Sequence, residues 1–197
     1  MNSLEFSTIY KNKIINLLLK NKNFIQLINP TPNECEDIDT IDILLGGDWI
    51  IDGKKYHEQG YIFDYDFTDD TTDEEKTFVM VETDIEFVHK NTFVDFNLYV
   101  CIFTSKKLVR INEFTSPNIQ QVKEMGYVVG NRANRIDILC NIVNKILNGN
   151  NNFPGIGSIS PVDRGYVTLY QPNNKYYGKC LKYNITNLND IDYECEN

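Results

Sequence analysis

The segments TFVMVETDIEFV (residues 77–88) and FVDFNLYVCIF (residues 93–103) alternate apolar and polar side chains along their length. An alternation of period two is typical of strands that bury one face. A polar turn at 89–92 joins them, so they predict a long antiparallel hairpin with one face in the core. The side chains expected on that face are Val79, Val81, Thr83, Ile85 and Phe87 in the first strand, and Val94, Phe96, Leu98, Val100 and Ile102 in the second.

Two amphipathic helices are predicted on either side of this hairpin. Residues 4–28 carry apolar side chains at helical spacing, with Ser3 as N-cap and Pro30 and Pro32 as stops. Residues 131–148 repeat the spacing, and Gly149 stands where a helix would end. Their apolar faces are typical of helices that cover a sheet.

Further strands are predicted at 165–170 and 176–185, with an edge strand or loop at 126–130 and a frayed tail after Asn187. Helices beside a run of antiparallel strands indicate an α+β fold, with both helices packed on one face of an antiparallel sheet. The chain of 197 residues is long enough for one core, and a single domain over 1–197 is expected.

Residues 33–75 form an acidic and aromatic segment inserted in that domain. The turn-forming pair Asp52-Gly53 and the length of the segment predict an extended loop or β-hairpin arm. Two interpretations remain open for its aromatic side chains: they anchor an intermolecular contact, which is slightly favoured, or they fold back over the sheet. The interface candidates are Trp49, Tyr56, Tyr61, Phe63, Tyr65 and Phe67, together with Arg132 and Arg135 as intersubunit ion-pair residues.

Charge and cysteine usage narrow the function classes. A net charge of −9 opposes binding to nucleic acid phosphates and anionic membranes, which indicates a protein partner. The N-terminus has neither a signal-peptide pattern nor an apolar run long enough for a membrane span. Five scattered cysteines make a poor disulfide framework. Cys101 and Cys140 are therefore expected to be buried reduced thiols in a reducing compartment.

No residue pattern predicts catalysis, a cofactor or a metal site. His57 and His89 belong to no metal-ligand or triad spacing. The cluster Asp64, Asp66, Asp69 and Asp70 suggests calcium, but the central glycine of an EF-hand loop is missing. The glycines at 155–157 follow a helix, so they indicate a turn and not a phosphate loop. The chain is expected to be an assembly or interaction protein and not an enzyme.

Several local sequences, at 10–27, 130–139, 155–157 and 176–183, resemble the head-to-tail connector proteins of tailed bacteriophages. The similar segments include Ile14-Ile15-Asn16-Leu17-Leu18 and Gly130-Asn131-Arg132-Ala133-Asn134-Arg135. The resemblance is to the tail-terminator or tail-completion group, and the composition suits a neck ring protein of a crAss-like phage.

That resemblance implies a structural virion protein that forms a cyclic homo-oligomer in the neck or upper tail, after assembly in the host cytoplasm. Its partners would be portal, connector or tail ring proteins, with DNA only as passing cargo and with no cofactor. An acidic lumen would repel DNA. Two alternatives remain: a non-virion module that binds or inhibits a host factor, and, least favoured, a metal-dependent enzyme.

Overall fold

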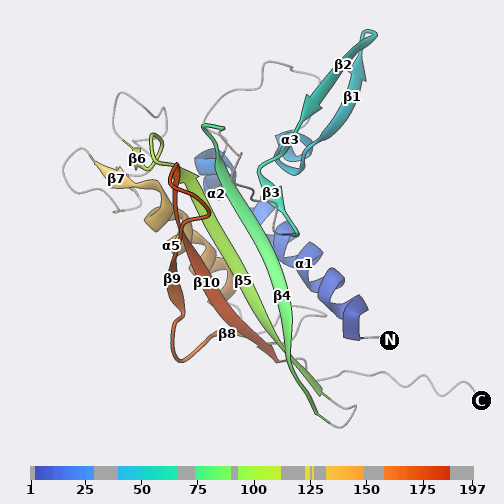
Figure 1. Ribbon diagram of the computed structural model, residues 1–197, viewed down its shortest axis with the longest axis vertical. Helices are drawn as coiled ribbons and strands as arrows, with labels where there is room; N and C mark the ends of the chain where they lie inside the picture. The colour runs from blue at the N-terminus through green and yellow to red at the C-terminus, as the bar shows by residue number, and fades with distance from the viewer. Residues whose placement is uncertain are drawn as a thin grey trace, which may run out of the picture.

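The computed structural model describes residues 3–28, 40–65, 74–89, 93–111, 123–124, 126, 132–148 and 158–186. Its main sheet has the strand order β3-β4-β5-β10-β8, and β9 also pairs with β10 (Figure 1). All of these pairings are antiparallel except that of β3 with β4. The strands are β3 (Ile62–Phe63), β4 (Thr77–His89), β5 (Phe93–Ser105), β8 (Ser158–Pro161), β9 (Val167–Tyr170) and β10 (Tyr176–Thr186).

The β4–β5 hairpin is the centre of the sheet, as the alternation predicts. The two strands pair from Thr77 opposite Thr104 to His89 opposite Phe93, with one irregularity between Ile85 and Phe87. On the face expected to be buried, Val79, Val81, Phe96, Leu98, Val100 and Ile102 are all fully buried. The alternation therefore assigns the core face correctly for these residues.

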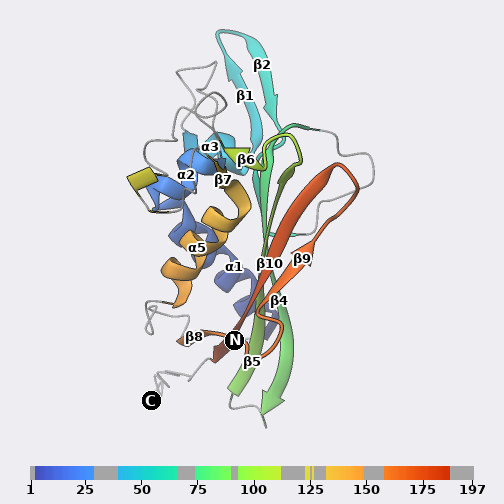
Figure 2. The same cartoon turned by 90° about the vertical axis from the view of Figure 1, so that its left-hand side faces the viewer.

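Three helices cover that face: α1 (Ser3–Leu19), α2 (Lys22–Ile28) and α5 (Arg135–Asn148). Figure 2 shows them as one layer beside the edge-on sheet. The α+β architecture predicted from the sequence is thus confirmed. None of the described helices is long and apolar enough to cross a membrane.

The predicted boundaries of the helices need correction. The single helix expected at 4–28 is interrupted, because the Asn21 side-chain oxygen accepts a hydrogen bond from the Phe24 N–H (3.1 Å) and starts a new helix. The later helix begins at Arg135 and not at 131, because Asn134 caps it by accepting from the Ile136 N–H at 2.9 Å. The residues just before it form β7 (Ala133–Asn134), which pairs with β6 (Arg110–Ile111).

The opposite face of the sheet carries a second, smaller core. Phe63, Phe78, Phe103 and Tyr176 form an aromatic cluster on it, with ring centroids 5.5 Å apart for Phe78 and Phe103. Next to this cluster lie Met80, Cys101 and Cys180. The central strands are thus buried on both faces in this part of the sheet.

Cys101 and Cys180 form a disulfide between β5 and β10, which contradicts the expectation that Cys101 is a reduced thiol. The two residues lie 79 positions apart in sequence and become direct partners only through the register of the two strands. Cys140 is a buried free thiol, as expected. Burial raises its pKa to about 12, so it stays protonated. Cys35 and Cys195 lie outside the described residues.

The C-terminal strands are found as β9 and β10, close to the predicted ranges. The sequence did not predict β8, because it has only one buried apolar residue, Ile159, and ends at Pro161. Pairing with the last residues of β10 defines this strand. The predictions for 127–130, for Gly149, for the glycine turn at 155–157 and for the tail lie outside the described residues.

Candidate interaction surface

The inserted segment contains a second hairpin, formed by β1 (Gly47–Ile51) and β2 (Lys54–Glu58). Its turn residues Asp52 and Gly53 have φ angles of 50° and 77°. Two successive positive φ values match a type I′ turn, whose twist suits two antiparallel strands. Of the two forms predicted for the arm, the hairpin is therefore the one that these residues adopt, and we call it the projecting hairpin.

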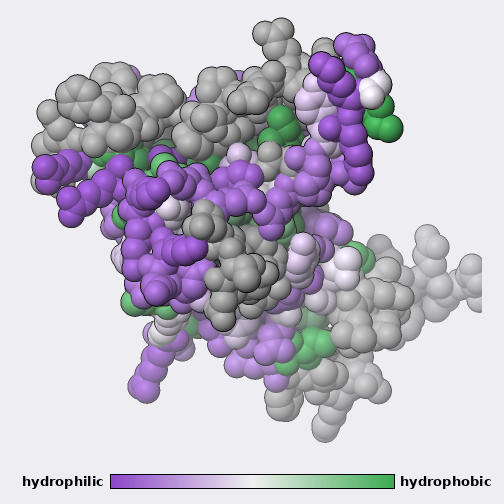
Figure 3. Space-filling model, turned by 45° about the horizontal axis from the view of Figure 1, so that its top comes forward, coloured by the Kyte–Doolittle hydropathy of each residue, from purple (hydrophilic) through white to green (hydrophobic). Residues whose placement is uncertain are grey.

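The projecting hairpin extends beyond the sheet and helices, at the upper right of Figure 1. Ile50 is 77% exposed, and Tyr56 is also exposed. So are Ile41 and Leu45, which lie in the short helix just before the hairpin. Figure 3 shows apolar surface on one side of this otherwise hydrophilic projection. An isolated two-stranded hairpin is only marginally stable in water, so such a projection is typical of an element that acquires a partner.

A tight backbone junction joins the projecting hairpin to the body. The short helix α3 (Thr40–Leu45) precedes it, and after the hairpin the Tyr61 N–H donates to the Leu44 carbonyl at 2.8 Å. Gly60 has a φ of 89°, and a Cβ on it would lie 2.9 Å from the backbone of Leu45 and Gly46. Only glycine fits this crossing of the chain without displacing the backbone.

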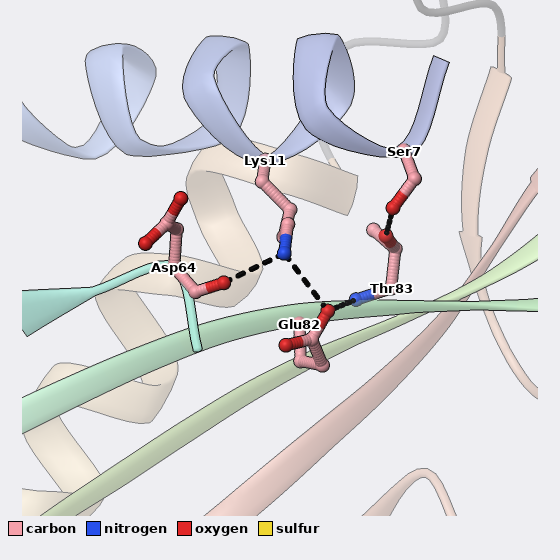
Figure 4. A network of polar contacts seen from close by, with 5 residues as sticks. All are labelled: Ser7, Lys11, Asp64, Glu82 and Thr83. Carbon is pink, nitrogen blue, oxygen red and sulfur yellow. Dashed lines mark hydrogen bonds and ion pairs between the residues drawn. The ribbon is translucent and has the colours of Figure 1, made fainter. Parts of the chain in front are cut away.

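Lys11 on α1 secures the base of this arm (Figure 4). Its Nζ donates to the Asp64 carbonyl at 2.7 Å and lies 3.1 Å from Oε1 of Glu82 on β4. The Lys11 side chain is only 15% exposed, so the contact is shielded from water. Nearby, the hydroxyls of Ser7 and Thr83 are 2.6 Å apart. Helix, arm and sheet are thus linked at one point.

Charged groups of the projecting hairpin pair with one another. The Nδ1 of His57 lies 2.9 Å from Oδ1 of Asp48, and Lys55 lies 3.8 Å from the same carboxylate. The hydrogen bond from His57 and the charge of Lys55 lower the pKa of Asp48. All three side chains are more than half exposed, so the group suits recognition of a polar partner at an interface rim.

Of the four carboxylates suggested as a calcium site, the structure describes only Asp64. Asp64 uses its carbonyl to accept from Lys11, while Asp66, Asp69 and Asp70 lie outside the described residues, as does the His89 side chain. Within the described ranges, no group of three or more His, Cys, Asp or Glu side chains could hold a metal ion.

The predicted interface aromatics divide into two groups. Trp49 and Tyr56 are paired opposite each other on the projecting hairpin. Tyr61 and Phe63 are buried in the body, where β3 lies alongside β4, so the fold-back interpretation holds for these two. Tyr65 is exposed, and its ring makes a T-shaped contact with that of Phe63 (5.6 Å between centroids). Phe67 lies outside the described residues.

The two candidate arginines also differ. Arg132 is exposed and lines an open hollow of about 440 Å³. Arg135 is only 2% exposed and donates to the carbonyls of Leu27 and Leu108, which contradicts its interpretation as an intersubunit ion-pair residue. Burial lowers its pKa to about 10. It joins α2, α5 and the loop after β5.

A second exposed apolar surface, which the sequence did not reveal, lies on β9. Leu169 is 63% exposed and Val167 is 44% exposed. Both lie on the helix-side face of the sheet, because they pair with Lys179 and Leu181 of β10. The hollow beside Arg132 continues this surface through Tyr177, on the same face of β10. We call Val167, Leu169, Tyr177, Arg110 and Arg132 the β9 surface.

Comparison with known proteins identifies a family. The model of the YomW family matches residues 12–185, which include the second half of α1, the later helices, the projecting hairpin and all of the main sheet except the last residue of β10. No curated protein and no solved structure matches the chain. The family is phage-derived, which agrees with the phage origin expected from the sequence. The chain therefore belongs to the YomW family, and this membership indicates a phage protein.

Proposed function

We propose that this phage protein is a structural virion subunit that assembles with copies of itself into a ring in the neck or upper tail. The observation that carries the proposal is the projecting hairpin. It places Ile50 and Tyr56 in solvent, on an element without a core of its own. Exposed aromatic and aliphatic side chains with a charged rim are characteristic of protein interfaces.

The way in which the projecting hairpin is attached to the body also supports a role in assembly. The close crossing at Gly60 holds the start and end of the hairpin together, and the Tyr61 carbonyl and Lys11 tie the residues that follow it to β4 and α1. A hairpin held in one direction loses less conformational freedom on binding than a loose loop would. The net charge of −9 suits a ring whose lumen must not retain DNA, because like charges repel.

Mass photometry of the purified chain, followed by negative-stain imaging, tests this function. We expect discrete rings. The variant Ile50→Ser should assemble at least tenfold more weakly. Lys54→Ser is the matched control, because Lys54 is exposed and pairs with Ile51, on the opposite face of the hairpin from Ile50, and it should leave assembly nearly unchanged.

Mass spectrometry of purified virions provides an independent measurement, with the protein expected in stoichiometric amounts. A strict monomer that is absent from virions would refute the structural role. A monomer that captures a host protein in an Ile50-dependent manner would favour the alternative, a host-factor-binding module.

A further inference from the structure

The two exposed apolar surfaces lie at opposite sides of the main sheet. The projecting hairpin is attached through β3, at one edge, whereas β9 lies at the other edge beyond β10. Figure 1 shows this separation, and the view in Figure 2 faces the β9 side. A contact between two different surfaces of identical chains repeats head to tail and generates a closed ring or a filament.

The charges of the two sides are complementary. Residues 40–65, which include the projecting hairpin and its junction with the body, contain five carboxylates and two lysines, a net charge of −3. Residues 158–186 contain four cations and one carboxylate, a net charge of +3 in a chain whose total is −9, and one of these cations, Lys179, pairs with Asp137 of α5 at 2.6 Å. The β9 surface adds Arg110 and Arg132, both exposed. Opposite charges favour contact between the hairpin side of one chain and the β9 side of another. Like charges disfavour contact between the same sides of two chains.

Both surfaces also carry exposed apolar side chains. The projecting hairpin extends from the body and presents Ile50, the most exposed of the large apolar side chains described (Figure 1). The β9 surface offers exposed Leu169 and Val167, and the open hollow of about 440 Å³ that Tyr177 lines on the same face. In the described part of the sheet, β9 pairs on one side only, so its other edge can accept a further strand.

We infer that the partner of the projecting hairpin is the β9 surface of a second copy of this chain. Ile50 packs near Leu169 and the Arg132 hollow of the neighbour, and the acidic hairpin side meets the basic side of β8 to β10. The inference rests on the proposed self-assembly and adds the acceptor site that the assembly requires.

Complementation between two variants tests the inference. Ile50→Asp disables the projecting hairpin, and Leu169→Asp disables the β9 surface; both positions are exposed, so both variants should fold. Each variant alone is expected to be monomeric. Mixed at equal concentration, they should form one-to-one dimers and no rings, because one intact hairpin and one intact β9 surface remain available.

Thr168→Asp is the matched control, because Thr168 is an exposed neighbour on β9 that pairs with Cys180 on the other face of the sheet. It should still form rings. Wild-type rings together with an Leu169→Asp variant that still forms rings would overturn the inference and leave the proposed function intact. A wild type that is monomeric at all concentrations and absent from virions would overturn both.

A photo-crosslinking residue at position 50 gives a second readout. In assemblies mixed from ¹⁴N- and ¹⁵N-labelled chains, we expect crosslinks between chains that map to peptides within 158–186. Crosslinks from one hairpin to another hairpin would instead indicate a two-fold contact and contradict the head-to-tail arrangement.

Discussion

Two antiparallel hairpins in this protein differ in what lies against their faces. The β4–β5 hairpin has strands of 13 residues, and its side chains contact helices on one face and an aromatic cluster on the other. The projecting hairpin has strands of five residues and leaves Ile50 in solvent. The difference indicates that the first hairpin stabilises the fold, whereas the second presents a surface.

The largest expected effect comes from truncating one apolar side chain in each hairpin. Leu98→Ala on β5 removes a fully buried side chain and should lower the free energy of unfolding by about 3 kcal/mol. Ile50→Ala should change it by less than about 0.5 kcal/mol, because the side chain is exposed. Urea denaturation at concentrations where the chain is monomeric measures both. Equal losses would show that the projecting hairpin belongs to the core.

A smaller effect is expected at the junction of the two regions. Gly60→Ala places a Cβ within 2.9 Å of the backbone of Leu45 and Gly46, and should cost roughly 2 kcal/mol in unfolding free energy. Gly53→Ala is the control: its φ is also positive, but nothing lies within 4 Å of the added atom. Its cost should stay near 1 kcal/mol and be confined to the hairpin tip. Amide hydrogen exchange of β1 and β2 locates the change. A larger loss of unfolding free energy in Gly53→Ala than in Gly60→Ala would contradict a rigid junction at Gly60.

The smallest expected effect is a pH dependence of the body. Cys140 has its pKa raised from 9.0 to about 12 by burial, so the folded chain keeps a proton that the unfolded chain releases. This contribution to stability is complete below pH 9 and is lost as the pH rises from 9 towards 12. Between pH 7 and pH 10, wild type should therefore lose about 1 kcal/mol more than Cys140→Ala. Urea unfolding at both pH values checks this, and identical losses would exclude the thiol as the cause.

Sequence reasoning predicted elements whose pattern is local. The alternation of 77–88 and 93–103 assigned the β4–β5 hairpin, and helical spacing found α5 with an error of four residues at its start. The pair Asp52-Gly53 marked the turn of the projecting hairpin, because a type I′ turn requires positive φ at both positions. The same pattern could not assign β8, whose short sequence has little alternation of its own.

The candidate site was predicted only in part. Trp49 and Tyr56 lie on the projecting hairpin as expected, but Tyr61, Phe63 and Arg135 are buried. An aromatic or charged side chain has the same local signature whether it meets a neighbouring chain or its own core. Leu169 was missed for the converse reason, because an apolar residue in a strand is normally expected to be buried.

The sequence by itself determined the α+β class, the central hairpin, the amphipathic helices and the turn of the arm, because each depends on periodicity or backbone preference within a few residues. The tertiary structure decided which apolar side chains remain exposed, since that depends on what packs against them from distant segments. It also decided the pairing of Cys101 with Cys180, across 79 positions, and the placement of two exposed apolar surfaces at opposite edges of one sheet. Strand order and register set both, and neither is encoded in a local pattern.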